Sequence, residues 1–508
     1  MFKKICLGIV FLLFCYLYIF TGTHSDDIIH IVNLKDNLYE LFINIFTTPL
    51  YLKGIPIIVY DFLQFYYFDF GSIYFDFIKI LTSFSAFYII YIFMNDYMKS
   101  SKAFLFSLIF ILFPIHDATN YWTVGQYLII TLAFVMLSHR LIHKDKNIKG
   151  FLIGLLGSFS GYASPPFVFG LSIIFLLNKQ YKKFITFLLP QIIYIIYYLV
   201  ISKVFNTQTI KGSSDFSIVS LIKQFILQVG TFIDASIGPS FWLKIYYSIM
   251  QLTLFSMIIG VVLVILFYKY YKIEKEKTNK QLLIVLALVV LFAFGMFALT
   301  GMYPQIAFNL GNRVTIYGSL LISFLVVMLL MNNKKSATVV FSIFIFSSLG
   351  ISNHWKMWNK TQLQVINNIK TNKDIQKFDR TKQLFVTYNQ YSKLGDLSHI
   401  EFFAQGMATH IFKFATKEDY KVSTLNRRFV YRNSYLLDKK YGTKIDIDDT
   451  VYVYDSKLNE LVEIKKEDIQ EYIDTLPMDN RHWVQLLNKD NFIMKIVLKL
   501  MPRLEYAL

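Results

Sequence analysis

Two adjacent carboxylates follow the first apolar run of this sequence. Asp26 and Asp27 come directly after Ser25, a few residues beyond Phe20. Carboxylates so close to hydrocarbon cost free energy unless they are solvated or partnered, so a pair suggests a general base, a metal ligand or an acceptor-binding group. The pattern also fits a helix start, where Ser caps the first turn and Asp complements the helix dipole. Both interpretations remain open.

A second polar stretch, Pro114 to Trp122, lies between two apolar runs. It contains His116, Asp117 and Trp122 and no basic residue. One interpretation is a polar lip that faces the first outer loop, 22–71; the other is a turn with an aromatic residue at the membrane interface. A single His among scattered carboxylates does not have the spacing of a metal-ligand motif.

The third stretch is Asn312-Arg313, at the start of a late apolar run. Arginine suits an anionic ligand because its planar guanidinium binds phosphate through two hydrogen bonds. The alternative is an Arg that pairs with lipid headgroups. Elsewhere, Asp76 and Lys79 are one helical turn apart and are predicted to pair or to extend toward the interface. Asp234 is predicted to be solvated.

The elements that must position these residues are membrane helices. The chain of 508 residues is 55% hydrophobic and only 17% charged, whereas soluble domains are about 45–50% apolar. A span needs about 20 mostly apolar residues, and the pattern predicts about eleven spans, several of them short. The predicted spans are 5–21, 72–94, 103–115, 124–138, 151–163, 165–178, 184–202, 245–268, 281–299, 315–331 and 336–350.

Basic residues gather in every second loop. Clusters such as Lys3-Lys4, Arg140 to Lys149 and Lys269 to Lys280 belong to one set of loops, and the alternate loops are poor in Lys and Arg. Because cytoplasmic loops retain basic residues, this alternation predicts a cytoplasmic N-terminus and an extracytoplasmic C-terminal region. It also explains the net charge of +17 without nucleic acid.

The sequence predicts two domains. Residues 1–350 form a transmembrane domain with long outer loops at 22–71, carrying interfacial helices, and at 203–244. Residues 351–508, where charges of both signs become frequent, form a small soluble α+β domain outside the membrane. Within it we expect a strand at 383–387, a β-hairpin at 450–464, a helix at 467–476 and a basic amphipathic helix at 492–500.

Together these features resemble the GT-C-fold membrane glycosyltransferases, which use polyprenyl-phosphate-linked sugars as donors. The resemblance rests on Asp26 and Asp27 after the first span, the long first outer loop, the second acidic outer loop with His116 and Asp117, and the trailing outer domain. It covers most of the chain as topology, through short motifs. It implies an α-helical polytopic fold in the cell membrane and an enzyme that transfers a sugar to an envelope glycan, lipid or protein acceptor on the outer face.

The resemblance also implies roles for the candidate residues. Asp27 or Asp26 would be the general base, and Arg313 would stabilise the polyprenyl phosphate as it leaves. Asp117 would help to position the acceptor or a divalent ion, and His116, Trp122 and Asn312 would also bind substrate. A divalent ion, Mg²⁺ or Mn²⁺, is compatible with Asp26, Asp27 and Asp117 as ligands. The chain has no phosphate-cradling glycine loop, serine elbow or HExxH motif.

Two other functions remain open at this point. A polysaccharide polymerase or ligase would also use a lipid carrier, but usually relies on several outer-loop arginines. A transporter or flippase of lipid-linked glycans would show related halves and ionisable residues at mid-membrane depth. The break at Pro165-Pro166 is the best sequence feature in favour of transport.

Overall fold

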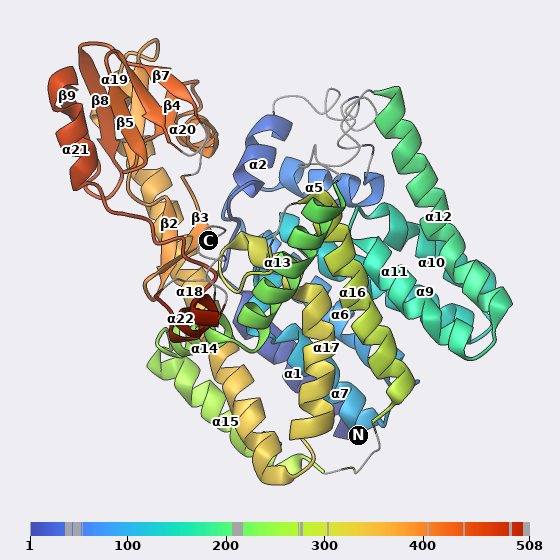
Figure 1. Ribbon diagram of the computed structural model, residues 1–508. Coiled ribbons are helices and arrows are strands. Elements are labelled where there is room, and N and C mark those ends of the chain that lie inside the picture. Colours follow the sequence, from blue (N-terminus) through green and yellow to red (C-terminus); the bar gives the residue numbers. More distant parts are fainter. Residues whose placement is uncertain are drawn as a thin grey trace.

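The structure is a computed structural model of the chain. It describes residues 2–35, 43, 52, 54–205, 217–272, 274, 278–301, 304–403, 406–439, 442–486 and 490–500. Figure 1 shows a large helical body and, at its upper left, a smaller region that contains the strands. The N-terminus lies at the opposite, lower end of the helical body.

Helices dominate the first 371 residues. They are α1 (Phe2–Tyr18), α2 (Asp27–Lys35), α5 (Ile55–Tyr67), α6 (Ile73–Met94), α7 (Ser100–Ile111), η1 (Pro114–His116), α8 (Ala118–Tyr121), η2 (Val124–Gln126), α9 (Tyr127–His143), α10 (Asn147–Phe159), α11 (Ser164–Leu177), α12 (Tyr181–Val204), α13 (Ile218–Ser236), α14 (Pro239–Ile249), α15 (Leu254–Tyr270), α16 (Lys280–Thr300), η3 (Leu310–Thr315), α17 (Ile316–Leu325), η4 (Val326–Leu330) and α18 (Lys334–Thr371).

The number of helices that can span a membrane is smaller than predicted. Within the described residues, seven segments are long and apolar enough. They are Ile73–Met94, Val124–His143, Tyr181–Val204, Ile218–Ile249, Lys280–Thr300, Leu310–Leu330 and Lys334–Thr371. Five further apolar helices have only 10–17 residues, below the roughly 20 needed for a hydrocarbon core. The fold is therefore that of a helical membrane protein, but the count of about eleven spans is not supported.

The predicted span 245–268 shows why sequence hydropathy overcounts. Helix α14 ends at Ile249, and α15 begins at Leu254 after Thr253. The Thr253 side chain accepts a hydrogen bond from the Ser256 amide, and Ser256 in turn accepts from the Thr253 amide. This reciprocal cap starts a new helix within an apolar stretch, so continuous hydropathy does not mean a continuous helix.

Two parts of the predicted outer loops are helical. Helices α2 and α5 lie in the segment 22–71, whereas residues 36–42, 44–51 and 53 of that segment are outside the described ones. Both helices lie at the upper end of the helical body, the end that also carries the strands (Figure 1). Helices α13 and α14 lie mostly in the segment 203–244 and by length and composition form one of the seven apolar segments.

The C-terminal region begins while α18 is still continuous. This helix runs from Lys334 to Thr371, so residue 351 lies inside it. The elements that follow are α19 (Lys373–Lys377), β1 (Gln383–Thr387), β2 (Tyr391–Leu394), β3 (Leu397–Glu401), α20 (Met407–Thr416), β4 (Lys421–Thr424), β5 (Phe429–Arg432), β6 (Tyr435–Asp438), β7 (Lys444–Asp446), β8 (Thr450–Asp455), β9 (Glu460–Lys465), η5 (Lys466–Asp468), α21 (Ile469–Thr475) and α22 (Phe492–Leu500).

The main sheet of this region has the order β4-β1-β8-β9. Strand β1 is parallel to both β4 and β8, and β9 returns antiparallel to β8 as the predicted hairpin. The predicted strand at 383–387 and the helices near 467–476 and 492–500 are also confirmed. Parallel pairing with the intervening helix α20 makes this a small α/β region, where we had predicted α+β.

The hairpin β2–β3 lies between the main sheet and the helical body (Figure 1). Strand β3 of this hairpin carries His399, and the turn at Gly395 contacts the ring of Tyr247. Helix α18 passes from the helical body to the strand region and packs on both α14 and α20. These two elements carry residues of the strand region into the helical body.

Candidate functional site

The segment after α1 is held by an ion pair from α6. The carboxylate of Asp76 accepts hydrogen bonds from the amides of Phe20 at 2.6 Å and Gly22 at 2.8 Å. Lys79 lies 3.6 Å from Asp76 and donates to Thr21 Oγ1 and to the Gly22 carbonyl. Phe20 and Gly22 have positive φ angles, so these bonds stabilise a sharp turn. The predicted pairing of Asp76 with Lys79 is confirmed, and it fixes the chain just before Asp27.

Asp27 is fully buried at the start of α2. Its Oδ2 accepts the His24 amide at 2.8 Å, and its Oδ1 accepts the Val124 amide at 3.1 Å. The carboxylate therefore accepts one hydrogen bond from the preceding turn of its own segment and one from the loop between α8 and α9. Val124 lies two residues after the stretch Pro114 to Trp122 and brings this loop into contact with the first outer loop. Asp26 is only partly buried.

The electrostatic surroundings of Asp27 favour its neutral form. Burial raises the pKa of Asp27 to about 7, although the two backbone amides and Lys79 oppose the rise. Asp61 on α5 is 8% exposed, and burial together with the charge of Asp27 holds its pKa well above the usual range. A carboxyl whose pKa lies near neutrality can exchange a proton at physiological pH, as a general base must.

His30 lies one helical turn beyond Asp26. Its ring stacks on Phe65 of α5 at 5.5 Å between centroids and 11° between planes. Burial lowers the pKa of His30, while the charge of Asp26 opposes that shift. Asp26, Asp27, His30 and Asp61 are called the Asp27 cluster below. The sequence analysis missed Asp61, whose signal was a single carboxylate in the otherwise apolar run 55–67.

Arg313 lies against the same loop that contacts Asp27. Its guanidinium stacks over the ring of Trp122 at 5.0 Å, and its Nη1 donates to the Leu310 carbonyl at 3.0 Å. The stretch 122–124 thus contacts both predicted residues, Arg313 through the Trp122 ring and Asp27 through the Val124 amide. Stacking of this kind fixes the plane of a guanidinium, a planar group whose geometry suits carboxylate and phosphate.

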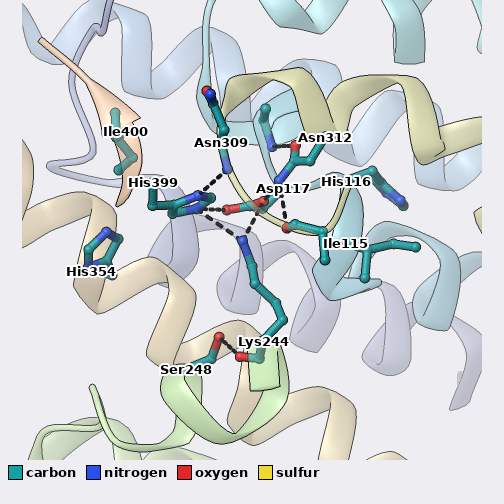
Figure 2. A network of polar contacts seen from close by, with 12 residues as sticks. Ile115, His116, Asp117, Lys244, Ser248, Asn309, Asn312, His354, His399 and Ile400 are labelled. Carbon is teal, nitrogen blue, oxygen red and sulfur yellow. Dashed lines mark hydrogen bonds and ion pairs between the residues drawn. The ribbon is translucent and has the colours of Figure 1, made fainter. Parts of the chain in front are cut away.

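Asp117 is the centre of a different buried network (Figure 2). Its Oδ1 lies 3.1 Å from Lys244 Nζ and also accepts a hydrogen bond from Asn312 Nδ2. Its Oδ2 accepts from the indole Nε1 of Trp355 at 2.9 Å and contacts His399 Nε2 at 2.9 Å. Asp117 is 2% exposed and the other four side chains are fully buried. We call these five residues the Asp117 network.

The tautomer of His399 follows from its hydrogen bonds. The amide of Asn309 lies 2.9 Å from His399 Nδ1 and can only donate, so Nδ1 must be the acceptor. The ring proton is then on Nε2, which donates to Asp117 Oδ2. Burial and the charge of Lys244 lower the pKa of His399, against the attraction of Asp117. His399 is therefore neutral, and the charge of Asp117 is balanced by Lys244.

Asp117 is ionised for the same reasons. Burial alone would raise its pKa, but the charge of Lys244 and the hydrogen bonds from His399 and Trp355 lower the pKa well below the usual range. The network joins the loop after η1 to α14, η3, α18 and β3, which are far apart in sequence. It connects the strand region to the helical body and leaves Asp117 little capacity for substrate.

Asn312 and His116 are both occupied inside the protein. Asn312 Oδ1 accepts the Ala118 amide at 3.2 Å while its Nδ2 donates to Asp117. His116 points away from Asp117 (Figure 2), and its Nδ1 lies 2.9 Å from Ser319 Oγ. Burial lowers the pKa of His116 to about 3, so the ring is neutral. Adjacent residues of the predicted lip thus face different surroundings.

The prediction that Asp234 is solvated is wrong. Asp234 is 1% exposed, and Ser240 Oγ donates to its Oδ2 at 2.5 Å. The amides of Gln485 and Leu486 also donate to its two oxygens, each at 3.0 Å. Asp234 therefore holds the segment before α22 on α13, a role that depends on residues about 250 positions away.

The predicted divalent ion finds little support in the side chains. In the described part of the chain, no group of three His, Cys, Asp or Glu residues is arranged to hold a metal ion. Asp117 in particular has both oxygens engaged by Lys244, Asn312, Trp355 and His399. Asp26, Asp27 and Asp117 do not form a common ligand set.

The sequence analysis missed Lys244, Trp355 and His399. Each lies 127 or more residues from Asp117, and nothing in the local pattern marks them as its partners. The one signal was Lys244 itself, a basic residue in a stretch predicted to lie outside, where the positive-inside rule disfavours it.

Comparisons with protein-family models, curated proteins and solved structures found no match for this chain. The resemblance to GT-C-fold glycosyltransferases therefore rests on the sequence features described above.

Proposed function

We propose that this protein is an integral membrane glycosyltransferase. It transfers a sugar from a polyprenyl-phosphate-linked donor to an envelope glycan, lipid or protein acceptor on the outer face of the membrane. The observation that carries the proposal is the stretch 122–124, which contacts both a carboxyl with a pKa near 7 and a stacked guanidinium. Such a base and such an anion-binding group are what glycosyl transfer from a lipid phosphate requires.

The reaction divides between these two groups. Asp27, or the more exposed Asp26, takes the proton of the acceptor hydroxyl as its oxygen attacks the anomeric carbon. The bond from that carbon to the donor phosphate oxygen breaks, and the polyprenyl phosphate leaves with the bonding electrons. Arg313 stabilises the negative charge that develops on the phosphate. A positioned base typically contributes about 10²–10⁴-fold to the rate.

The membrane geometry supports the same assignment. The apolar helices are compatible with a lipid-linked donor, and the basic clusters predict a cytoplasmic N-terminus. Helices α2 and α5 and the strand region lie at the other end of the helical body (Figure 1). That end would face outward, where lipid-linked rather than nucleotide-linked sugars are the available donors.

The test is the envelope glycan mass profile of cells that carry single variants. Asp26→Asn and Asp27→Asn are compared with wild type and a deletion, after equal amounts of protein in the membrane have been shown. Asp145→Asn is the matched control because Asp145 is exposed and pairs with Lys183 away from this site. Loss of the same sugar mass in the deletion and in at least one of the two variants supports the proposal.

The outcomes also separate the alternatives. If the deletion loses a sugar mass but neither Asp variant does, neither Asp26 nor Asp27 is the general base, and the proposed mechanism is wrong. If the deletion leaves the glycan profile unchanged, the transferase function falls, and transport of lipid-linked glycans becomes the next hypothesis to test.

A further inference from the structure

The strand region contains a crevice of the type that binds ligands in α/β folds. Strands β4, β1 and β8 are parallel, so their carboxyl ends share one edge of the sheet. The chain leaves β1 toward β4 through α20, whereas it leaves β8 in the opposite direction toward β9. In open α/β sheets, ligands bind at the carboxyl edge where the connections diverge in this way.

A cavity of about 350 Å³ lies at this edge. Its walls include Tyr388 and Asn389 after β1, Asn426 after β4 and Lys457 after β8. Strand β2 and helix α18 close it from the side of the helical body through Tyr391 and Trp358. The volume is at the lower end of the range for small-ligand sites and suits one or two sugar rings.

Two observations indicate that the cavity binds a polar ligand. Its lining includes the side-chain amide of Asn389 and the ammonium groups of Lys393 and Lys457. Tyr388 and Asn389 are consecutive residues with φ angles of 61° and 45°, a conformation that costs non-glycine residues free energy. A sparsely populated backbone conformation of this kind persists only where the surrounding structure holds it, and such positions cluster at ligand sites.

The walls of the cavity are held rigid by their own hydrogen bonds. Gln390 donates to the Leu425 carbonyl at 2.9 Å and accepts from Asn426 at 2.9 Å. Asn389 Nδ2 donates to Ser456 Oγ at 3.1 Å. These bonds join the three strand ends to one another, so the site is formed before a ligand arrives and little entropy is lost on binding.

The side chains around the cavity define the ligand class. Three aromatic side chains, Trp358, Tyr388 and Tyr391, line the cavity, with Lys457 over the Tyr388 ring at 5.9 Å and Arg481 over the Tyr391 ring at 4.5 Å. Aromatic rings combine apolar faces with polar edges, which suits a sugar ring. Lys393 and Lys457 add positive charge, while the lining carboxylate of Asp479 is paired with Arg481 at 3.2 Å. A dinucleotide is disfavoured because Tyr388 and Asn389 stand where glycines would let the backbone approach a pyrophosphate.

We infer that this cavity is a binding site for a saccharide that carries an anionic group. The inference rests on the proposed function and deepens it, since such a site would hold the acceptor glycan. The hairpin β2–β3 connects this cavity to the helical body. Tyr391 of the hairpin lines the cavity, Ser392 contacts His354 of α18 at 2.9 Å, and His399 belongs to the Asp117 network.

The test is equilibrium binding to the purified full chain in detergent, measured by calorimetry without turnover. The probes are glucose 1-phosphate and trigalacturonate as anionic saccharides, maltotriose as a neutral one, and inorganic phosphate and acetate as anions without a sugar. At least one anionic saccharide is expected to bind about tenfold or more tightly than maltotriose, and more tightly than phosphate or acetate.

Variants locate the binding at this cavity. Lys457→Gln is expected to weaken the anionic saccharide about tenfold, and Trp358→Phe, which replaces the indole by a smaller aromatic ring, several-fold. Lys465→Gln is the matched control because Lys465 pairs with Thr450 at the opposite end of β8, and it should bind like wild type.

Three results would overturn the inference. They are no binding of either anionic saccharide, equal binding of inorganic phosphate, and equal weakening by Lys457→Gln and Lys465→Gln. The glycan mass profile of the Asp26 and Asp27 variants is independent of these measurements. If the Asp variants lose a sugar mass but no probe binds, the transferase proposal is supported and the proposed saccharide site is wrong. If a probe binds but the deletion leaves the glycan profile unchanged, the saccharide site is supported and the transferase proposal is wrong.

Discussion

The Asp27 cluster and the Asp117 network both bury a carboxylate, yet their surroundings have opposite effects. Asp117 has a lysine at 3.1 Å and donors from three other side chains, which lower its pKa. Asp27 accepts hydrogen bonds from two backbone amides, and burial raises its pKa to about 7 although these amides and the charge of Lys79 oppose the rise. Burial itself does not decide the role of a carboxylate; the charge placed beside it does.

The difference in charge compensation distinguishes a structural carboxylate, Asp117, from a candidate catalytic one, Asp27. A fully compensated carboxylate is stable as an anion and joins distant elements. An under-compensated one changes its protonation near neutral pH and is a candidate for proton transfer. Four predictions test this contrast, in order of decreasing effect.

The largest effect is expected from Asp117→Asn. It leaves Lys244 buried without its counter-charge, and breaking a buried pair typically costs about 3–5 kcal/mol. We expect a large loss of folded protein, measured by detergent size-exclusion and thermal unfolding. The double variant Asp117→Asn/Lys244→Met should recover part of the loss because neither charge remains. A stable Asp117→Asn protein that lacks activity would instead assign Asp117 to substrate binding.

The next effect is a pH dependence that arises from Asp27. Because its folded pKa of about 7 lies above the unfolded value, the folded state binds more protons between these values. The stability that Asp27 contributes is fully present below its unfolded pKa, near 4. This contribution decreases by up to about 1.4 kcal/mol per pH unit as the pH rises to about 7.

Activity should show the opposite trend. If ionised Asp27 is the base, the turnover rate increases with pH and levels off above about 7. Thermal unfolding and turnover between pH 5 and 8 measure both trends, with Asp27→Asn as the comparison. This variant should flatten the stability profile, and a profile as steep as that of wild type would assign the titration to another group.

A smaller effect is expected where α14 and α18, which carry Lys244 and Trp355, approach each other. A Cβ added at Gly350 would lie 1.8 Å from the Ser248 carbonyl oxygen, so Gly350→Ala must push the helices apart, at a cost of about 1–3 kcal/mol. Gly295→Ala on α16 is the control because no heavy atom lies within 4 Å of its added Cβ. Equal unfolding temperatures of the two variants would contradict the close contact.

The smallest effect is expected from Arg313→Lys. Lysine keeps the charge but loses the planar stacking on Trp122 and the two-pronged phosphate contact, so we expect about a tenfold loss of turnover with little change in stability. Turnover at saturating donor and the unfolding temperature measure both. An unchanged turnover would assign Arg313 to lipid headgroups.

Local patterns predicted some elements well. The hairpin from Thr450 to Lys465 and the strand Gln383–Thr387 follow from alternation and turn residues close together in sequence. The pairing of Asp76 with Lys79 follows from helical spacing. The number of spans did not follow, because caps such as Thr253 end helices inside apolar stretches.

The sequence by itself determined that this chain is a helical membrane protein and where its carboxylates, cations and aromatic residues occur. These properties depend on composition and on residues within a few turns of one another. Only the tertiary structure decided that Asp117 meets Lys244 and His399, that Asp234 is buried, and that the charge of Asp27 acts on the buried Asp61. The reason is physical: the ionisation of a buried group depends on charges a few ångströms away in space, and those come from segments that the sequence places more than a hundred residues apart.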